Sequence, residues 1–125
     1  MGNNTPYTNG KSLSLEMCRE YLGQEVTITI DQPYGSVYKG TTYEANYGSV
    51  PGTLAPDGLE LDAYFLGPKE PLEAAAGTCI AIVHRLDDDD DKLILVKRGE
   101  EWSDERIEEA VHFREQFFRH EIVRR

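Results

Sequence analysis

The chain has few of the features that mark membrane, secreted or nucleic-acid-binding proteins. Its 125 residues contain only two cysteines, and no apolar run approaches the roughly 18 residues of a membrane span. The first ten residues are polar and lack the apolar centre of a signal peptide. Positive charge is also scarce, since 13 Lys and Arg stand against 23 Asp and Glu, for a net charge of -10. We therefore expect neither a membrane nor a nucleic-acid partner, because nucleic-acid binders present basic surfaces.

The two cysteines, Cys18 and Cys79, lie far apart, and neither belongs to a C-x-x-C pair. Cys18 stands in a helical pattern and Cys79 in an apolar strand pattern. Both patterns are typical of small buried side chains in a reduced protein, while a structural disulfide is the second interpretation. The cysteine usage thus favours a cytoplasmic protein.

The composition predicts one domain over residues 1–125. Hydrophobic residues make up 39% of the chain and charged residues 29%, which is near the average of globular proteins. Residues 1–11 are rich in Asn, Thr and Gly, and we expect them to be flexible.

Helical signals stand near the two ends of the chain. Ser14 is placed to cap a short helix over residues 15–22, which Gly23 ends. Ser103 is placed to cap a longer helix that carries a broad apolar stripe. The stripe consists of Ile107, Ala110, Val111, Phe117 and Phe118.

Strand signals fill the region between these helices. The sequence V-T-I-T-I over residues 26–30 alternates as a half-buried strand does. Residues 78–86 and 92–97 are apolar runs on either side of a short acidic turn, which predicts a hairpin. His84, in the first run, is interpreted as a core residue rather than a ligand. Short strands separated by Gly and Pro turns, with a helix after them, predict a mainly β fold with α, an OB-like barrel.

The central stretch begins with aromatic and amide side chains in a loop rich in Gly and Pro, residues 43–56, and continues through the turn Asp57-Gly58. Residues 59–65 then alternate as a strand. Leu59, Leu61, Ala63 and Phe65 would face the core, and Glu60, Asp62 and Tyr64 the other side. Carboxylates grouped in this way indicate either a solvated face or a site for a hard cation.

A second acidic group is the run Asp87 to Asp91. Five adjacent carboxylates repel one another, so the run is either an exposed hairpin tip screened by water or a cation site. If neighbouring strands bring this turn close to Asp57 and Asp62, several oxygen ligands converge, as Mg²⁺ requires. Lys92 would then supply positive charge to a phosphoryl oxygen.

Several segments resemble the family I soluble inorganic pyrophosphatases, and the match runs from Val26 to the end of the chain. Y-E-A-N-Y-G over residues 43–48 resembles the family's Y-P-x-N-Y-G, and residues 57–62, D-G-x-x-x-D, resemble its D-G-D-P-x-D. The hairpin over residues 87–92 is similar to the family's D-x-x-x-x-D-x-K, with a shorter spacing. His112-Phe113 resembles the H-F of its last helix.

The resemblance implies an OB-like five-stranded barrel and Mg²⁺-dependent hydrolysis of diphosphate, with Mn²⁺ as the alternative cation. By the same likeness, Tyr47 would order the substrate and the attacking water, and Lys92 would address the substrate. It also implies a homo-oligomer. The metal ligands that it implies are Asp57, Asp62, Asp87 and Asp90.

The sequence departs from the family pattern at several positions. Leu59 stands where the family has the aspartate taken as general base, and Glu60 replaces the proline beside it. Thr29 stands at a glutamate position, and Phe117 and Phe118 stand where a Tyr-Lys pair binds phosphate. Glu60, on the same predicted face as Asp62, is the candidate replacement for the base.

Two functions fit these observations. The first is hydrolysis of diphosphate, or of a related phosphoanhydride, by a short and divergent pyrophosphatase. The second is a catalytically degenerate barrel that serves as a metal- or phosphate-binding or assembly module. The retained aspartates favour the first, and the departures Leu59, Phe117 and Phe118 favour the second.

Overall fold

The computed structural model describes residues 7–8 and 11–125, so most of the predicted flexible segment lies outside the described residues. In chain order the elements are β1 (Tyr7–Thr8), β2 (Lys11–Ser12), α1 (Leu13–Arg19), β3 (Glu25–Gln32), β4 (Val37–Tyr38), β5 (Thr41–Thr42), β6 (Asn46–Ser49), β7 (Asp62–Phe65), β8 (Ala74–Arg85), β9 (Lys92–Val96), α2 (Asp104–Glu115) and β10 (His120–Val123). No helix in this described part has the length and hydropathy needed to cross a membrane.

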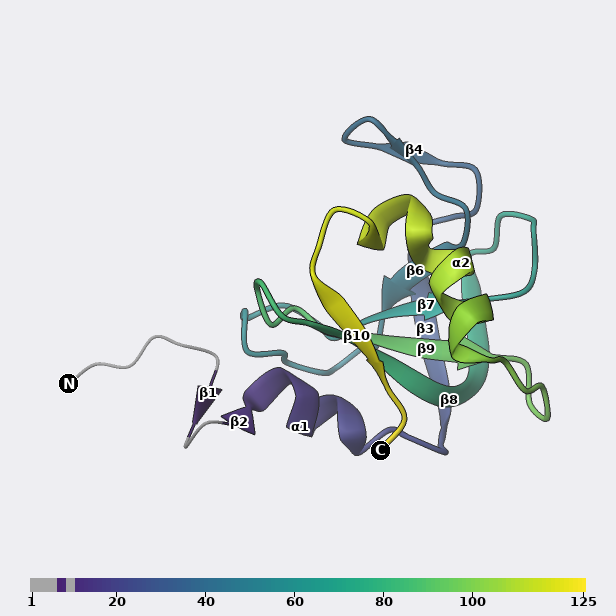
Figure 1. Ribbon diagram of the computed structural model, residues 1–125. Helices are drawn as coiled ribbons and strands as arrows, with labels where there is room; N and C mark the ends of the chain where they lie inside the picture. Colours follow the sequence, from purple (N-terminus) through teal and green to yellow (C-terminus); the bar gives the residue numbers. More distant parts are fainter. Residues whose placement is uncertain (1–6, 9–10) are drawn as a thin grey trace.

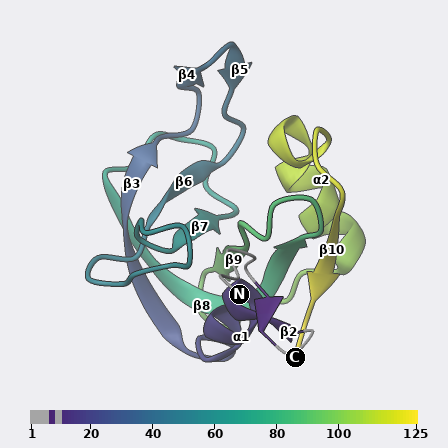
Figure 2. The same cartoon turned by 90° about the vertical axis from the view of Figure 1, so that its left-hand side faces the viewer.

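Five strands close into a ring in the order β8-β3-β6-β7-β9, because β9 pairs back onto β8 (Figure 1). The pairings are antiparallel except for β7 with β9, which is parallel. β10 joins the outer edge of β8. Figure 2 shows α2 beside the ring and α1 across one end. The expected mainly β fold with five barrel strands and two helices is confirmed.

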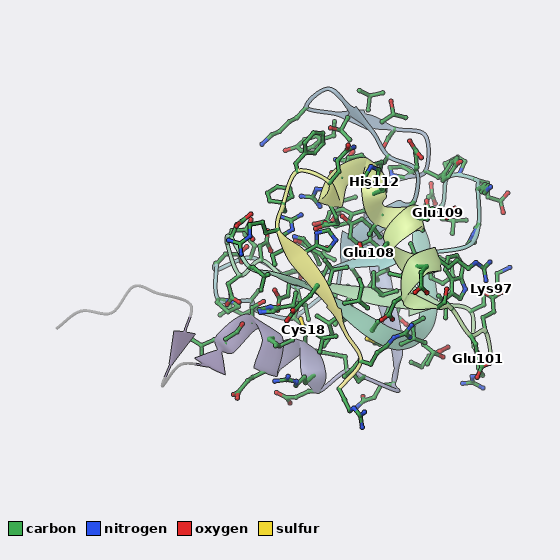
Figure 3. All side chains as sticks on the ribbon, in the orientation of Figure 1. Cys18, Lys97, Glu101, Glu108, Glu109 and His112 are labelled. Carbon is green, nitrogen blue, oxygen red and sulfur yellow. The ribbon has the colours of Figure 1, made fainter. Side chains whose placement is uncertain are left out.

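Two apolar clusters explain why whole strands are buried. One lies inside the ring against α1, and the other lies between the outside of the ring and α2. Alternate residues of β9 belong to different clusters, with Leu93 and Leu95 in the first and Ile94 and Val96 in the second. Cys18, labelled in Figure 3, and Cys79 are both buried, free thiols of the inner cluster, so the disulfide interpretation is wrong.

The prediction for the first helix was wrong in its start. α1 begins at Leu13, and its N-cap is Ser12, whose hydroxyl accepts a hydrogen bond from the Leu15 amide at 3.0 Å. Ser14, the expected cap, lies inside α1 and accepts a hydrogen bond from the Asp91 amide at 3.2 Å. Two serines two residues apart are both competent caps, and contact with the hairpin decides between them.

The last helix begins as expected but ends earlier. Ser103 is its N-cap and accepts a hydrogen bond from the Arg106 amide at 3.1 Å. The helix ends at Glu115, so Phe117 and Phe118 do not continue its apolar stripe. After the turn, β10 finds backbone partners on β8 and gives the segment a strand instead.

The central stretch differs most from the prediction. Residues 46–49, expected to be a loop, form β6, where a Cβ on Gly48 would lie 1.8 Å from the Thr29 carbonyl oxygen of β3. The strand expected over residues 59–65 is shorter, because β7 starts at Asp62 and Leu59 is 68% exposed in the preceding loop. Tyr64, expected at a polar face, is fully buried under α2.

Candidate metal and phosphate site

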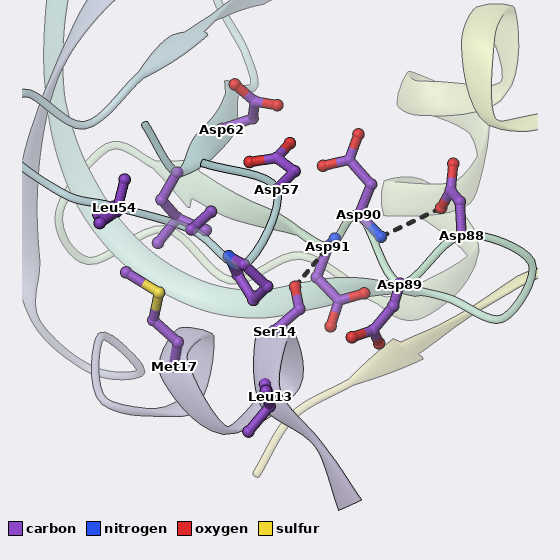
Figure 4. A pocket seen from close by; sticks show the side chains of 13 residues that line it. Leu13, Ser14, Met17, Leu54, Asp57, Asp62, Asp88, Asp89, Asp90 and Asp91 are labelled. Carbon is purple, nitrogen blue, oxygen red and sulfur yellow. Dashed lines mark hydrogen bonds between the residues drawn. The ribbon is translucent and has the colours of Figure 1, made fainter. Parts of the chain in front are cut away.

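A pocket of about 700 Å³ opens between the loop over residues 54–62, helix α1 and the acidic hairpin tip (Figure 4). One wall is apolar and the other is acidic. The apolar residues are Leu13, Met17, Leu54, Ala55, Pro56 and Leu61, and the acidic residues are Asp57, Asp62, Asp88, Asp89, Asp90 and Asp91. The two acidic turns, distant in sequence, therefore share one pocket.

Lys92 joins the two acidic turns. Its Nζ lies 2.8 Å from Asp62 Oδ2 and 2.9 Å from Asp90 Oδ2. Parallel pairing of β7 with β9 places Asp62 directly opposite Lys92, so backbone register fixes this contact. In Figure 4 the carboxylates of Asp57, Asp62 and Asp90 lie along one side of the pocket. Lys92 itself is fully buried, so its charge acts in a poorly solvated setting.

Tyr47 lies next to this group. Its ring centroid is 5.6 Å from Lys92 Nζ and 5.0 Å from the ring centroid of Tyr64. Burial raises the pKa of the Tyr47 phenol well above its usual value, although the adjacent Arg114 guanidinium opposes that rise. The phenol therefore stays protonated and is available as a hydrogen-bond donor near Asp62.

Four of the sequence-predicted site residues are not part of the pocket lining. Tyr47 and Lys92 lie behind it and contact Asp62, whereas Asp87 and Glu60 have partners elsewhere. Asp87 accepts a hydrogen bond from the Arg119 amide at 2.8 Å and is not part of the pocket lining. The Glu60 carboxylate accepts a hydrogen bond from the Gly52 amide at 2.9 Å and is not part of the lining either. Their roles as metal ligand and base stay predictions that the pocket geometry does not support.

A group that the sequence did not single out lies deeper in the hairpin, at the α1 side of the pocket. His84 Nδ1 lies 2.9 Å from Asp91 Oδ2 and 3.9 Å from Asp89 Oδ1, and all three residues are buried. Asp91 also accepts a hydrogen bond from the Arg85 amide, and Asp89 from the Ser12 hydroxyl. Burial raises the pKa of the Asp91 carboxyl to about 6. The hydrogen bond from the Arg85 amide and the neighbouring His84 act in the opposite direction and lower that pKa.

These three residues have ligand atoms close enough to hold a metal ion, but hydrogen bonds already use most of them. Among the described side chains of the group, Asp89 Oδ2 is left without a partner. The contacts of Asp89 with Ser12 and of Asp91 with Ser14 hold α1 against the hairpin. This structural role accounts for the group without a bound metal ion. The donors Asp57, Asp62 and Asp90 are oxygens only and fit a hard cation better than this mixed set does.

The family pattern named Inorganic pyrophosphatase matches residues 14–123 of the chain. The chain belongs to the inorganic pyrophosphatase family. This confirms the resemblance seen in its sequence. By that membership the chain is an inorganic diphosphatase, a hydrolase that acts on a phosphoanhydride.

Solved structures of bacterial inorganic pyrophosphatases share the fold of this family member. The Helicobacter pylori structure has a TM-score of 0.64 at 17% identity and covers 84% of this chain and 87% of its own. The Ehrlichia chaffeensis structure has a TM-score of 0.63 at 15% identity and covers 80% and 85%. The Coxiella burnetii structure has a TM-score of 0.59 at 22% identity and covers 77% and 78%. No curated protein matches the sequence.

One departure of this family member from the pattern that the resemblance implies has a visible structural role. Phe118 packs against Arg85, whose guanidinium carbon lies 3.7 Å from the ring centroid. Arg85 pairs with Glu115 through its Nε and Nη2 at 2.9 Å each, and Tyr64 donates to Glu115 at 2.6 Å. Phe117 is 67% exposed. Spacing alone could not reveal this network, since its residues come from β7, β8 and α2.

Proposed function

We propose that the pocket binds Mg²⁺ and hydrolyses inorganic diphosphate to two phosphates. The observation that carries this proposal is Lys92, which bridges Asp62 and Asp90 from two separate turns at the pocket wall. Buried cations beside several carboxylates fit a site that must hold both a metal ion and an anion. The family match supports the same reaction.

The metal-binding residues in this proposal are Asp57, Asp62 and Asp90. Asp57 and Asp62 lie at either end of one loop, and Asp90 faces them from the hairpin tip. When bound, a divalent ion supplies positive charge to diphosphate oxygens and acidifies water. Mg²⁺ is the first choice and Mn²⁺ the second, since carboxylate oxygens suit both ions.

The chain's own residues bind and orient the diphosphate. Lys92 offers a buried ammonium to a phosphoryl oxygen, and the protonated Tyr47 phenol offers a hydrogen bond next to it. In the reaction, the water oxygen forms a new bond to one phosphorus and the bridging P–O bond breaks, so the second phosphate leaves with the bridging oxygen. The proton that the water loses passes to the leaving phosphate or to solvent. Leu59 is exposed and apolar, so the usual aspartate base has no replacement at its own position.

Phosphate release from diphosphate tests this proposal. We expect turnover with Mg²⁺ or Mn²⁺, and Asp62→Asn should lower kcat by about 10²- to 10³-fold because it removes a positioned charge. Asp87→Asn is the matched control, since Asp87 is an aspartate of the same acidic hairpin that binds Arg119 instead of lining the pocket. If the parent turns over diphosphate no faster than Asp62→Asn does, hydrolysis is contradicted, and the alternative function as a metal-dependent binding module remains.

The proposal also places the protein in the cytoplasm, and two buried free cysteines, Cys18 and Cys79, fit such a reducing compartment. Self-association, expected from the family resemblance, stays a prediction. Sedimentation of the protein with and without Mg²⁺ measures it directly.

A further inference from the structure

Arg114, near the end of α2, lies next to Tyr47 of the proposed site. Its guanidinium carbon is 4.6 Å from the ring centroid of Tyr47 and 5.9 Å from that of Tyr43. The Tyr47 phenol interacts with both the Arg114 guanidinium and the Asp62 carboxylate. Arg114 and Lys92 thus both lie close to the Tyr47 ring, and Lys92 pairs with Asp62, which lines the pocket.

Arg114 forms no ion pair with a carboxylate in the described part of the chain, although it interacts with the Tyr47 phenol and, at longer range, with Glu115. Ion pairs there engage Arg85, Lys92, Arg119, Arg124 and two histidines, but not Arg114. Its Nη1 is buried and has no hydrogen-bond partner among these residues. A cation removed from water without a partner is costly, so an anion that binds there would be favoured.

Arg85 shows that the fold can satisfy a buried arginine when the role is structural. Its Nε and Nη2 donate to Glu115, its Nη1 donates to Asp88, and Phe118 packs against its guanidinium. Arg114 is adjacent to Glu115 in sequence, yet the Glu115 oxygens are taken by Arg85 and Tyr64. The contrast separates Arg114, whose Nη1 is buried without a hydrogen bond, from Arg85, whose guanidinium is matched within the fold.

We propose that Arg114 is a substrate-binding residue that takes the place of the missing phosphate clamps and contacts diphosphate together with Lys92. This inference rests on the proposed function. A diphosphate carries several negative charges, and the pocket wall is acidic, so metal ions and buried cations must together offset both. Arginine also suits phosphate oxygens, because its planar fork can donate two parallel hydrogen bonds.

Binding of imidodiphosphate, an analogue of diphosphate that resists hydrolysis, tests the proposal by titration calorimetry in Mg²⁺. Arg114→Met keeps most of the apolar stem and should weaken binding about 10- to 100-fold, as expected for one lost charge-assisted contact. Arg114→Lys should recover part of the affinity, because it restores the charge without the fork. Arg119→Met is the matched control and should bind as the parent does, since the Arg119 side chain is 79% exposed and pairs with Asp87 instead of lying beside Tyr47.

Thermal unfolding separates this role from a structural one. Without ligand, Arg114→Met should melt at or above the temperature of the parent, because it removes an unmatched charge. With Mg²⁺ and imidodiphosphate, the rise in melting temperature should shrink in that variant. Parent-like affinity of Arg114→Met, with or without lost stability, would overturn the proposal.

The two proposals fail in different ways. A parent that binds imidodiphosphate through Arg114 but does not hydrolyse diphosphate contradicts the proposed reaction and leaves Arg114 as a binding residue. A parent that hydrolyses diphosphate while Arg114→Met shows unchanged KM and affinity contradicts only the role of Arg114.

Discussion

Two groups of charged residues differ in how completely the protein satisfies them. The closed network, Arg85, Glu115 and Tyr64, lies between the ring and α2, and its buried charges are matched within the chain. The open site, Asp57, Asp62, Asp90, Lys92 and Arg114, lies at and behind the pocket wall, where carboxylates face solvent and the buried Arg114 Nη1 has no hydrogen-bond partner among the described residues.

This difference in internal partners indicates which of the two groups would be completed by a bound ligand. Desolvation of a charge costs free energy, and a fold recovers it only through good internal partners. The closed network has such partners, so its role is to join β7, β8 and α2. In the open site Lys92 has such partners, but the Nη1 of Arg114 has none among the described residues, which fits a place completed by metal ions and phosphate.

The largest expected effect comes from breaking the closed network. Glu115→Ala leaves buried Arg85 without its main partner, so the free energy of unfolding should fall by about 3–5 kcal/mol, as measured in urea. A loss below about 1 kcal/mol, as for a surface pair, would contradict the closed character of this network.

The next effect concerns Lys92 in the open site. Lys92→Met should lower kcat by about 10²- to 10³-fold, because it removes a positioned positive charge. Its unfolding free energy should fall less than that of Glu115→Ala, since the Asp62 and Asp90 side chains keep 25% and 34% exposure and can be hydrated. Steady-state kinetics and urea unfolding measure the two effects. The comparison fails if Lys92→Met loses stability but retains its kcat.

The smallest effect comes from a peripheral pair that joins β10 to α2. His120 Nε2 lies 2.6 Å from Glu108 Oε1 in this pair. Partial burial alone would lower the pKa of His120, but hydrogen bonds to Glu108 and to the Phe118 carbonyl outweigh it and raise that pKa. The free energy that this pair contributes to folding is therefore fully present below the unfolded-state pKa of histidine, about 6.5. It is lost as pH rises through the raised pKa of His120 in the folded protein.

Urea unfolding of the parent and of Glu108→Gln measures this peripheral pair. The Glu108 side chain is 45% exposed, so the difference at about pH 5.5 should stay below about 1 kcal/mol. It should vanish at about pH 9, where His120 is neutral. A difference that grows with pH would reverse the assigned sign.

The sequence predicted the parts of the fold that depend on local patterns. The β8–β9 hairpin and the Ser103 cap follow from apolar runs and from a capping residue, and both are present. The end of α2 was missed, because Phe117 and Phe118 continue a helical period that pairing of β10 with β8 overrides. Tertiary pairing, not propensity, decides that segment.

The candidate site shows the same limit. The acidic turns signalled Asp57, Asp62 and Asp90, and motif resemblance drew attention to Tyr47 and Lys92. Nothing local distinguishes Arg114 from a solvated helix residue. Its place beside Tyr47 depends on how α2 packs across β6, a contact between segments far apart in the chain. Asp87 was implied by the family resemblance and Glu60 by the predicted strand face that it shares with Asp62, and both accept backbone hydrogen bonds outside the pocket lining.

Anomalous diffraction from crystals soaked in Mn²⁺ tests the central claim most directly, because it locates the ion without relying on turnover. The account predicts a peak at about 2.0–2.2 Å from carboxylate oxygens of Asp62 and Asp90, with Asp57 beside it. A strong peak at His84, Asp89 and Asp91 instead, with none near Asp62, would contradict it.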